Sequence, residues 1–377
     1  MRLEVTAYSL DGERLQTLTQ ARNISVSADG ALSLDLPRGA PGIEYFENDV
    51  ALAVEIPDLA GNIYGPVHYG PYGEFSSRYI YTASDQSLTS PLGISTFTAA
   101  SIANAWFSSM RIVPPAIAAD VVEYPEDATP FSVISNRIAE AQSRGFGTGI
   151  TVIDGGGWAP ATIASKIKFE PFAGLDAFYM AVKDGRHAEL VWIGMTLYVL
   201  TPGTMSLDRS QFVRFQVKNF ADVPVKIDRT NMADSVIALG DNDLVAQWPE
   251  VLVGKIKIVQ ASGVSKAEVL DTIVKFEWET SQKPLREITA SLALSDDSPL
   301  VPFRDYRVGT IVAFPANGGR FENIPIAQIT LTRKLGEAFS GSIILDTKIE
   351  SLQVRMIQST KVATAGVSAV SGTGALR

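Results

Sequence analysis

Three alternating segments follow one another in the last third of the chain, and they constrain the fold more than any other feature. Each alternates apolar and polar residues, the pattern of a strand with one face on a core and the other toward solvent. None of the three carries an obvious catalytic group. The segments are Arg286–Leu294, Ser298–Phe314, which begins with a Pro-rich turn, and Ile324–Arg333. The chain therefore builds a β-rich domain from this region.

The first part of the chain is also predicted to be β structure. Leu3, Val5 and Ala7 alternate with polar residues, and Asp11-Gly12 is a hairpin-turn signal. Ala51–Ile56 reads as a buried strand. A chain of 377 residues exceeds one ordinary core, so several domains are expected. We expect a β domain over 1–115, an α+β insertion over 116–215, a second α+β element with a closing β domain over 216–350, and a flexible tail over 351–377.

Local signals place helices between these β regions. Thr129-Pro130 combines an N-cap residue with proline at the first helical position, and Gly145 marks the end of that helix. A shorter helix is expected over Asp176–Lys183, followed by two strands around Gly194. Ser265 to Glu268 forms a capping box that begins a further helix. Strands are also expected from Phe212 and from Ser235, at 212–217 and 235–240.

Charge and composition exclude several classes of protein. The net charge of −9 argues against a nucleic-acid grip, which needs a basic face, although an acidic wall lets DNA pass without adhering. The chain has no cysteine, which excludes disulfides, thiolate metal sites and cysteine nucleophiles. No uninterrupted apolar run is long enough to span a bilayer, and the first residues alternate rather than forming a signal-peptide core.

Candidate catalytic, metal and cofactor residues all lack the motif that would support them. A Ser-His-Asp triad would need His68 or His187, and no nucleophile elbow accompanies either histidine. Asp241-Asn242-Asp243 lacks the remaining ligands of a calcium loop, and Asp296-Asp297 is typical of a turn. The glycine clusters Gly145–Gly149 and Gly155–Gly157 lack nucleotide-binding spacing. We therefore predict no catalytic residue, no cofactor site and no metal site, and a protein that is not an enzyme.

Two alternatives stay open at this point. A loop rich in tyrosine has the composition of interfaces and sugar-binding surfaces, although aromatic residues also favour strands. A glycan-binding or receptor-binding protein would use Tyr64, Tyr69, Tyr72 and Tyr79 as its platform. A cell-wall hydrolase would use scattered aspartate and glutamate residues, since the chain has 41 acidic residues. Neither alternative has a sequence motif behind it.

The order of several segments resembles that of the minor tail proteins of siphoviruses infecting Actinobacteria. Any one of these segments alone is not diagnostic, and the order in which they occur carries the resemblance. The segments are Leu3–Leu15 at the start, Phe131–Gly145, Leu197–Thr204, Val301–Thr310 and Ile329–Arg333.

The resemblance implies a phage tail-hub fold, mainly β, in which two β-barrel tube-type domains carry inserted α+β domains. It implies a homotrimer whose six barrels imitate the subunits of the hexameric tail tube. It also implies a place at the virion tail tip, with the distal tail protein ring, the end of the tape-measure protein and tail fibres as partners. Viral DNA would pass through without sequence-specific binding. Within the C-terminal segment 351–377 of the chain, Ser359–Arg377 is expected to become ordered on binding a partner.

Overall fold

The structure of the protein is a computed structural model. It describes residues 3–28, 30–57, 63–64, 67–68, 74, 76–86, 93–111, 128–158, 174–184, 188–201, 208–216, 220, 223–240, 243–261, 267–294, 298–302, 304–315, 320–337 and 339–346. The expected tail over 351–377 and the expected domain boundary near residue 115 lie outside these residues.

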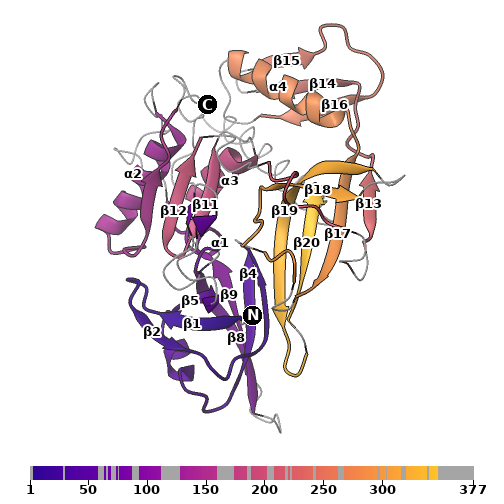
Figure 1. The fold of residues 1–377 in the computed structure, drawn as a ribbon. Helices are drawn as coiled ribbons and strands as arrows, with labels where there is room; N and C mark the ends of the chain where they lie inside the picture. The colour runs from indigo at the N-terminus through magenta and orange to yellow at the C-terminus, as the bar shows by residue number, and fades with distance from the viewer. Residues whose placement is uncertain are drawn as a thin grey trace.

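A single sheet of twelve strands forms the body of the molecule, and strands from both ends of the chain contribute to it (Figure 1). The described neighbours are antiparallel. In spatial order the strands are β13 (Val225–Asp228), β17 (Leu285–Ala293), β20 (Ser340–Asp346), β19 (Phe321–Arg333), β3 (Arg22–Ser27), β4 (Ala31–Pro37), β9 (Ile94–Ser101), β8 (Tyr79–Gln86), β5 (Ala51–Glu55), β1 (Glu4–Tyr8) and β2 (Arg14–Thr17), with β18 (Ile311–Pro315) paired to β19.

The pairing of β3 with β19 joins the two halves of this sheet. Thr330 pairs with Ser27 and Arg333 with Ile24, so strands about three hundred residues apart share one ladder. A continuous core lies beneath both halves and contains Val26, Leu34 and Phe97 together with Ile329 and Leu345. The predicted mainly-β fold is confirmed. The two β-barrel tube-type domains implied by the resemblance are not seen as closed barrels in the described pairings, because the edges of the two halves pair with each other in one sheet.

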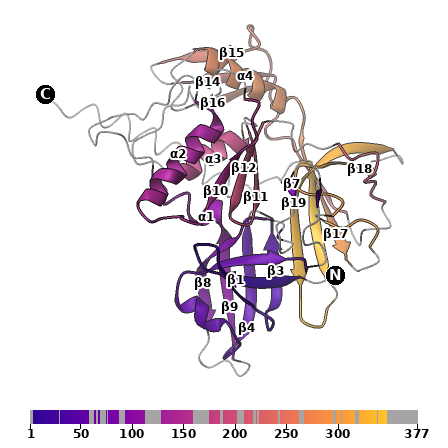
Figure 2. The ribbon, with the colours of Figure 1, turned by 60° about the vertical axis from the view of Figure 1, so that its left-hand side comes forward.

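A unit of helices and strands, called the inserted unit below, sits on the outer face of the N-terminal strands (Figure 2). Its core is apolar and includes Tyr8 and Ala51 from the large sheet alongside Phe178 and Trp192 from the inserted unit. Because β1 and β5 are covered on both faces, all but one of their residues are buried. The unit consists of α1 (Ile102–Ala105), α2 (Pro130–Ser143), β10 (Thr151–Asp154), α3 (Leu175–Asp184), β11 (Glu189–Ile193) and β12 (Thr196–Leu200).

The local signals in this unit predicted its elements correctly. Thr129 is the N-cap of α2, and its hydroxyl accepts from the backbone N–H of Ser132, whose own hydroxyl accepts from the N–H of Thr129. Gly145 follows the helix with φ +83°. The two strands expected around Gly194 are β11 and β12, antiparallel, and β10 adds to them in parallel.

A smaller two-layer unit lies between β13 and β17 in the sequence. Its sheet has the order β15 (Val245–Trp248), β14 (Ser235–Leu239), β16 (Ile256–Gln260), and α4 (Ala267–Ser281) covers one face of it. Figure 1 shows this unit above the ends of the large sheet. The remaining elements are the 3₁₀ helix η1 (Ile43–Glu47) and the two-stranded pair β6 (Ile63–Tyr64) and β7 (Val67–His68).

The strand expected from Phe212 is wrong. The segment begins at the end of a turn over residues 210–212, closed by hydrogen bonds from the N–H groups of Phe212 and Val213 to the carbonyl of Arg209. Among the described residues, backbone pairing with β18 consists of two isolated bridges, at Asp208 and Arg214. Hydrogen bonding within the turn replaced the ladder that the alternation predicted. The domain boundaries stay predictions.

Candidate functional site

Buried charges gather where the inserted unit meets the large sheet. Glu55 on β5 is 2% exposed, and its two carboxylate oxygens accept from the hydroxyls of Tyr8 and Thr6 on β1, at 2.7 and 2.8 Å. Arg14 on β2 adds an N–H 3.4 Å from the same carboxylate. Tertiary pairing of β1, β2 and β5 thus surrounds Glu55 with donors, which is the condition under which a buried carboxylate is tolerated.

A second ion pair lies beside it. Arg78 donates from Nε and Nη2 to one oxygen of Glu74, at 3.2 and 2.9 Å, and both side chains are buried. The guanidinium also stacks over the ring of Tyr8, with 3.5 Å to the ring centroid. Glu74 bridges to Glu55 through the backbone, so the two carboxylates are neighbours. The backbone N–H of Arg78 donates to the carbonyl of Gly194 at the β11–β12 turn.

The electrostatics of this cluster follow from burial. Burial raises the pKa of Glu74 above its ordinary value; the charge of Arg78 acts in the opposite direction, and Glu55 adds to the rise. Burial and the hydrogen bond to Glu55 raise the pKa of the Tyr8 phenol. Each carboxylate is already bound by a local donor, so the cluster has the character of a polar joint between two units.

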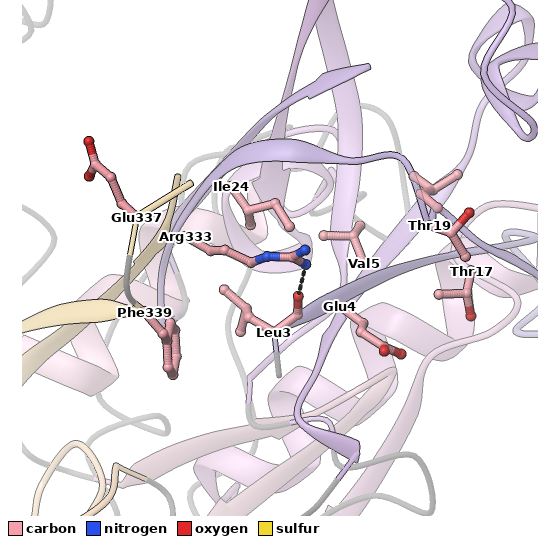
Figure 3. A pocket seen from close by; sticks show the side chains of 10 residues that line it. Leu3, Glu4, Val5, Thr17, Thr19, Ile24, Arg333, Glu337 and Phe339 are labelled. Atoms are coloured by element: carbon pink, nitrogen blue, oxygen red, sulfur yellow. Dashed lines mark hydrogen bonds between the residues drawn. The ribbon is translucent and has the colours of Figure 1, made fainter. Parts of the chain in front are cut away.

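A pocket lies at the seam where the two halves of the sheet pair (Figure 3). Its volume is about 460 Å³, within the range of ligand pockets. Arg333 lies in the middle of the residues drawn and donates to the carbonyl of Leu3 at 2.9 Å. It is lined by apolar residues together with threonines and carboxylates: Leu3, Glu4, Val5, Thr17, Leu18, Thr19, Ile24, Glu337 and Phe339.

Most candidate residues from the sequence are not brought together. His187, Asp241-Asn242 and Asp296-Asp297 lie outside the described residues, and His68 is described only as part of β7. Gly147, Gly156 and Gly157 have positive φ and serve turns. Within the described part of the chain, no group of three or more His, Asp or Glu residues could hold a metal ion.

The tyrosine platform loses one of its four members. Tyr79 has no exposed surface, and its hydroxyl donates to the carbonyl of Ser27 at 2.8 Å. It is a core residue of β8, because the alternation of that strand points it inward. Tyr69 and Tyr72 lie outside the described residues, as does the side chain of Tyr64.

Sequence reasoning missed the polar joint and the seam pocket. Both depend on residues brought together from distant positions, such as Leu3 and Arg333. The only available signal was Glu55 at the end of an otherwise apolar strand, which marks a buried carboxylate in need of partners. Among the described residues, no helix is long and apolar enough to cross a membrane.

Comparison of the whole fold with solved structures identifies similar proteins. The 43 kDa tail protein of prophage MuSo2 from Shewanella oneidensis matches with a TM-score of 0.60 at 13% identity, over 91% of this chain and 98% of that one. A tail protein from Neisseria meningitidis MC58 matches at 0.59 and 13%, over 92% and 97%. Prophage tail protein gp18 from Listeria monocytogenes EGD-e matches at 0.55 and 14%, over 96% and 99%.

The chain has the fold of phage tail proteins. No protein-family model matches the sequence, and no curated protein matches it. The fold match spans both halves of the large sheet and the inserted units, since it covers more than nine tenths of this chain and nearly all of each of these neighbours. The predicted likeness to phage tail proteins, with a mainly β fold, is confirmed.

Proposed function

We propose that this protein is a structural, non-enzymatic component of a phage virion, a homotrimeric hub at the tip of a siphovirus tail. The observation that carries the proposal is the end-to-end match to phage tail proteins, in which nearly all of both chains align. A catalytic domain added to a tail scaffold would leave a large part of this chain unmatched. The match therefore favours a structural role for the described chain.

The large sheet supports a role in a ring. Its outermost strands, β2 and β13, each pair with one neighbour among the described residues, so they form the two edges of the described sheet. Unpaired edges invite contact with other chains, and natural proteins usually cover them. A subunit with two such edges is suited to neighbours on both sides, which a closed ring supplies.

Charge supports a conduit. Three copies carry three times −9, or −27, and a wall of that sign repels DNA phosphates so that DNA slides without adhering. In this proposal the ring links the distal tail protein ring and the end of the tape-measure protein above to fibres or other tip proteins below. The segment Ser359–Arg377 is proposed to contact one of these partners. A strongly basic lumen in the assembled ring would contradict the conduit.

The test is the mass of the purified protein by light scattering across a range of concentrations. A mass three times that of one chain, which is 40.5 kDa, supports the hub, and electron microscopy should then show a ring with a central opening. A single-chain mass at every concentration, and no ring on addition of the distal tail protein, would contradict it. Deleting 359–377 should preserve the trimer and the melting temperature while weakening binding to tail partners.

A further inference from the structure

The most exposed large apolar side chain described in this structure is Phe212, at 81%. The turn that presents it is firmly held. The backbone N–H groups of Phe212 and Val213 donate to the carbonyl of Arg209 at 2.8 and 2.7 Å. The carboxylate of Asp208 accepts from the N–H of Ser210 at 2.9 Å. Val213 is buried in the core below. An aromatic ring held in water by an ordered turn costs little entropy to dock, which is the character of a binding anchor.

Two cations stand on either side of this ring in the sequence, and both are fixed. Arg209 donates from Nη1 to the carbonyl of Asp305 at 2.9 Å. The Arg214 guanidinium lies over the ring of Phe321, 4.5 Å from its centroid. Phe212 is therefore an apolar anchor with an arginine three residues before it and another two residues after it, and this is a specific chemistry for a partner site to match.

The seam pocket has the complementary chemistry. Phe339 lines it with a partly exposed ring above the buried Leu3 and Ile24, and the Arg333 guanidinium offers a flat cation over which an aromatic ring can stack. The carboxylates of Glu4 and Glu337 lie on opposite sides of that guanidinium (Figure 3). Lys334 lies 3.6 Å from Glu337, but both are more than half exposed, so that pair is weak and leaves Glu337 able to meet a second cation.

We propose that Phe212 of one copy of this chain inserts into the seam pocket of the next copy, with Arg209 and Arg214 facing Glu4 and Glu337. The inference rests on the ring of the proposed function and identifies one of its contacts. At 81% exposure, Phe212 cannot be filling the pocket of its own chain. A projecting group on one surface and a pocket on another make a head-to-tail contact, and repetition of such a contact closes a ring when the rotation permits.

The absence of cysteine makes this contact directly testable by crosslinking. Gln211→Cys places a thiol on the exposed turn and keeps the Phe212 ring, and Thr19→Cys places one on an exposed residue that lines the pocket. Each variant alone, treated with a short bismaleimide, is expected to stay a single chain on a denaturing gel. An equal mixture of the two is expected to give a two-chain product. A chain carrying both cysteines is expected to give a three-chain product.

Val251→Cys is the control, because Val251 is 74% exposed on the small unit and lies outside both surfaces. Paired with Thr19→Cys, it is expected to give no two-chain product. Both test positions are exposed, so the variants should have the melting temperature of the wild-type chain. A second measurement uses Phe212→Ala, which is expected to raise the concentration at which the three-chain mass forms by at least ~10-fold.

The outcomes separate this contact from the ring itself. A wild-type mass of three chains with no crosslink in the Gln211→Cys and Thr19→Cys mixture, and with unchanged assembly of Phe212→Ala, overturns the contact and leaves the hub standing. A wild-type chain that never exceeds one chain in mass overturns both. A two-chain product from Gln211→Cys alone would show a symmetric contact and overturn the head-to-tail arrangement.

Discussion

Two sheet faces in this molecule differ in whether the chain covers them. The outer face of β1 and β5 is covered by the inserted unit, and the charged groups there are matched to one another. The sheet of the small unit has α4 on one face, whereas the other face exposes Val245, Ile256 and Ile258, at 59%, 46% and 63%. Polar groups are thus buried inside the chain while aliphatic groups remain in water.

The large sheet and the inserted unit complete their contact within one chain, whereas the open face of the small unit is left uncovered. A buried ion pair contributes little net stability but strongly penalises the loss of either specific partner, so the joint fixes one arrangement of the two units. An aliphatic face left in water is typical of a surface that another molecule covers. The chain therefore completes its internal joint by itself and leaves other surfaces to the assembly.

The largest effect is expected from Arg78→Met. Removal of the guanidinium leaves Glu74 buried without its cation, and loss of one partner of a buried pair costs about 3–5 kcal/mol in the free energy of unfolding. Urea denaturation measures the change. The control, Arg144→Met, removes a surface partner of Glu140 and is expected to cost less than ~1 kcal/mol. Equal costs for the two variants would contradict the distinction between the joint and the surface.

Gly194→Ala should come next. Gly194 has φ +59°, and an added Cβ would collide with the carboxylate of Glu74. The left-handed backbone alone costs ~1–2 kcal/mol for alanine, and the collision brings the expected loss to about 2–4 kcal/mol. Gly145→Ala is the matched control, because φ is +83° and nothing lies within 4 Å of the added atom. Thermal unfolding should therefore rank Gly194→Ala well below Gly145→Ala.

Glu74→Gln should be milder than Arg78→Met near neutral pH, because the glutamine oxygen can still accept from Arg78 and the carboxylate of Glu55 remains nearby. The pKa of Glu74 is raised in the folded protein, so the folded state binds its proton more tightly than the unfolded state does. Its stabilising contribution is thus fully present below the ordinary pKa of 4.5 and is lost as pH rises through the folded pKa. Above pH 4.5, the unfolding free energy of the Glu74→Gln variant should fall less steeply with pH than that of the wild-type protein. Parallel profiles of unfolding free energy against pH would refute this assignment.

The smallest effect is expected on the open face. Ile258→Thr should change the unfolding free energy of the purified protein by no more than ~0.5 kcal/mol, because the side chain is 63% exposed. Val236→Ala, on the α4 face of the same sheet, should cost about 1–3 kcal/mol because Val236 is fully buried. A large loss from Ile258→Thr in urea denaturation would show that this chain itself covers the face.

Local signals predicted local elements well. The capping box at Thr129 and the glycine after the helix placed α2 within two residues of its observed ends, since capping depends only on neighbouring residues. Alternation predicted β17 and the paired β11 and β12 for the same reason. At Phe212 the same rule failed, because a turn hydrogen bond to Arg209 and isolated bridges to β18 took the place of a ladder.

The candidate site was not predictable in this way. No pattern in the sequence links Leu3 to Arg333 or Glu74 to Gly194, because each pair meets only after the sheet has closed. Tyr79 shows the converse error. Its residue type suggested a surface platform, whereas its position in β8 placed it in the core.

The sequence by itself determined the mainly-β character, the helices between the β regions and the acidic charge, because alternation, capping and composition act over short distances. The tertiary structure decided that the two β regions share one sheet through β3 and β19. It also decided which carboxylates are buried with partners and which surfaces remain uncovered. Those outcomes depend on contacts between distant segments, where the burial of apolar area and the pairing of strand edges select the partners.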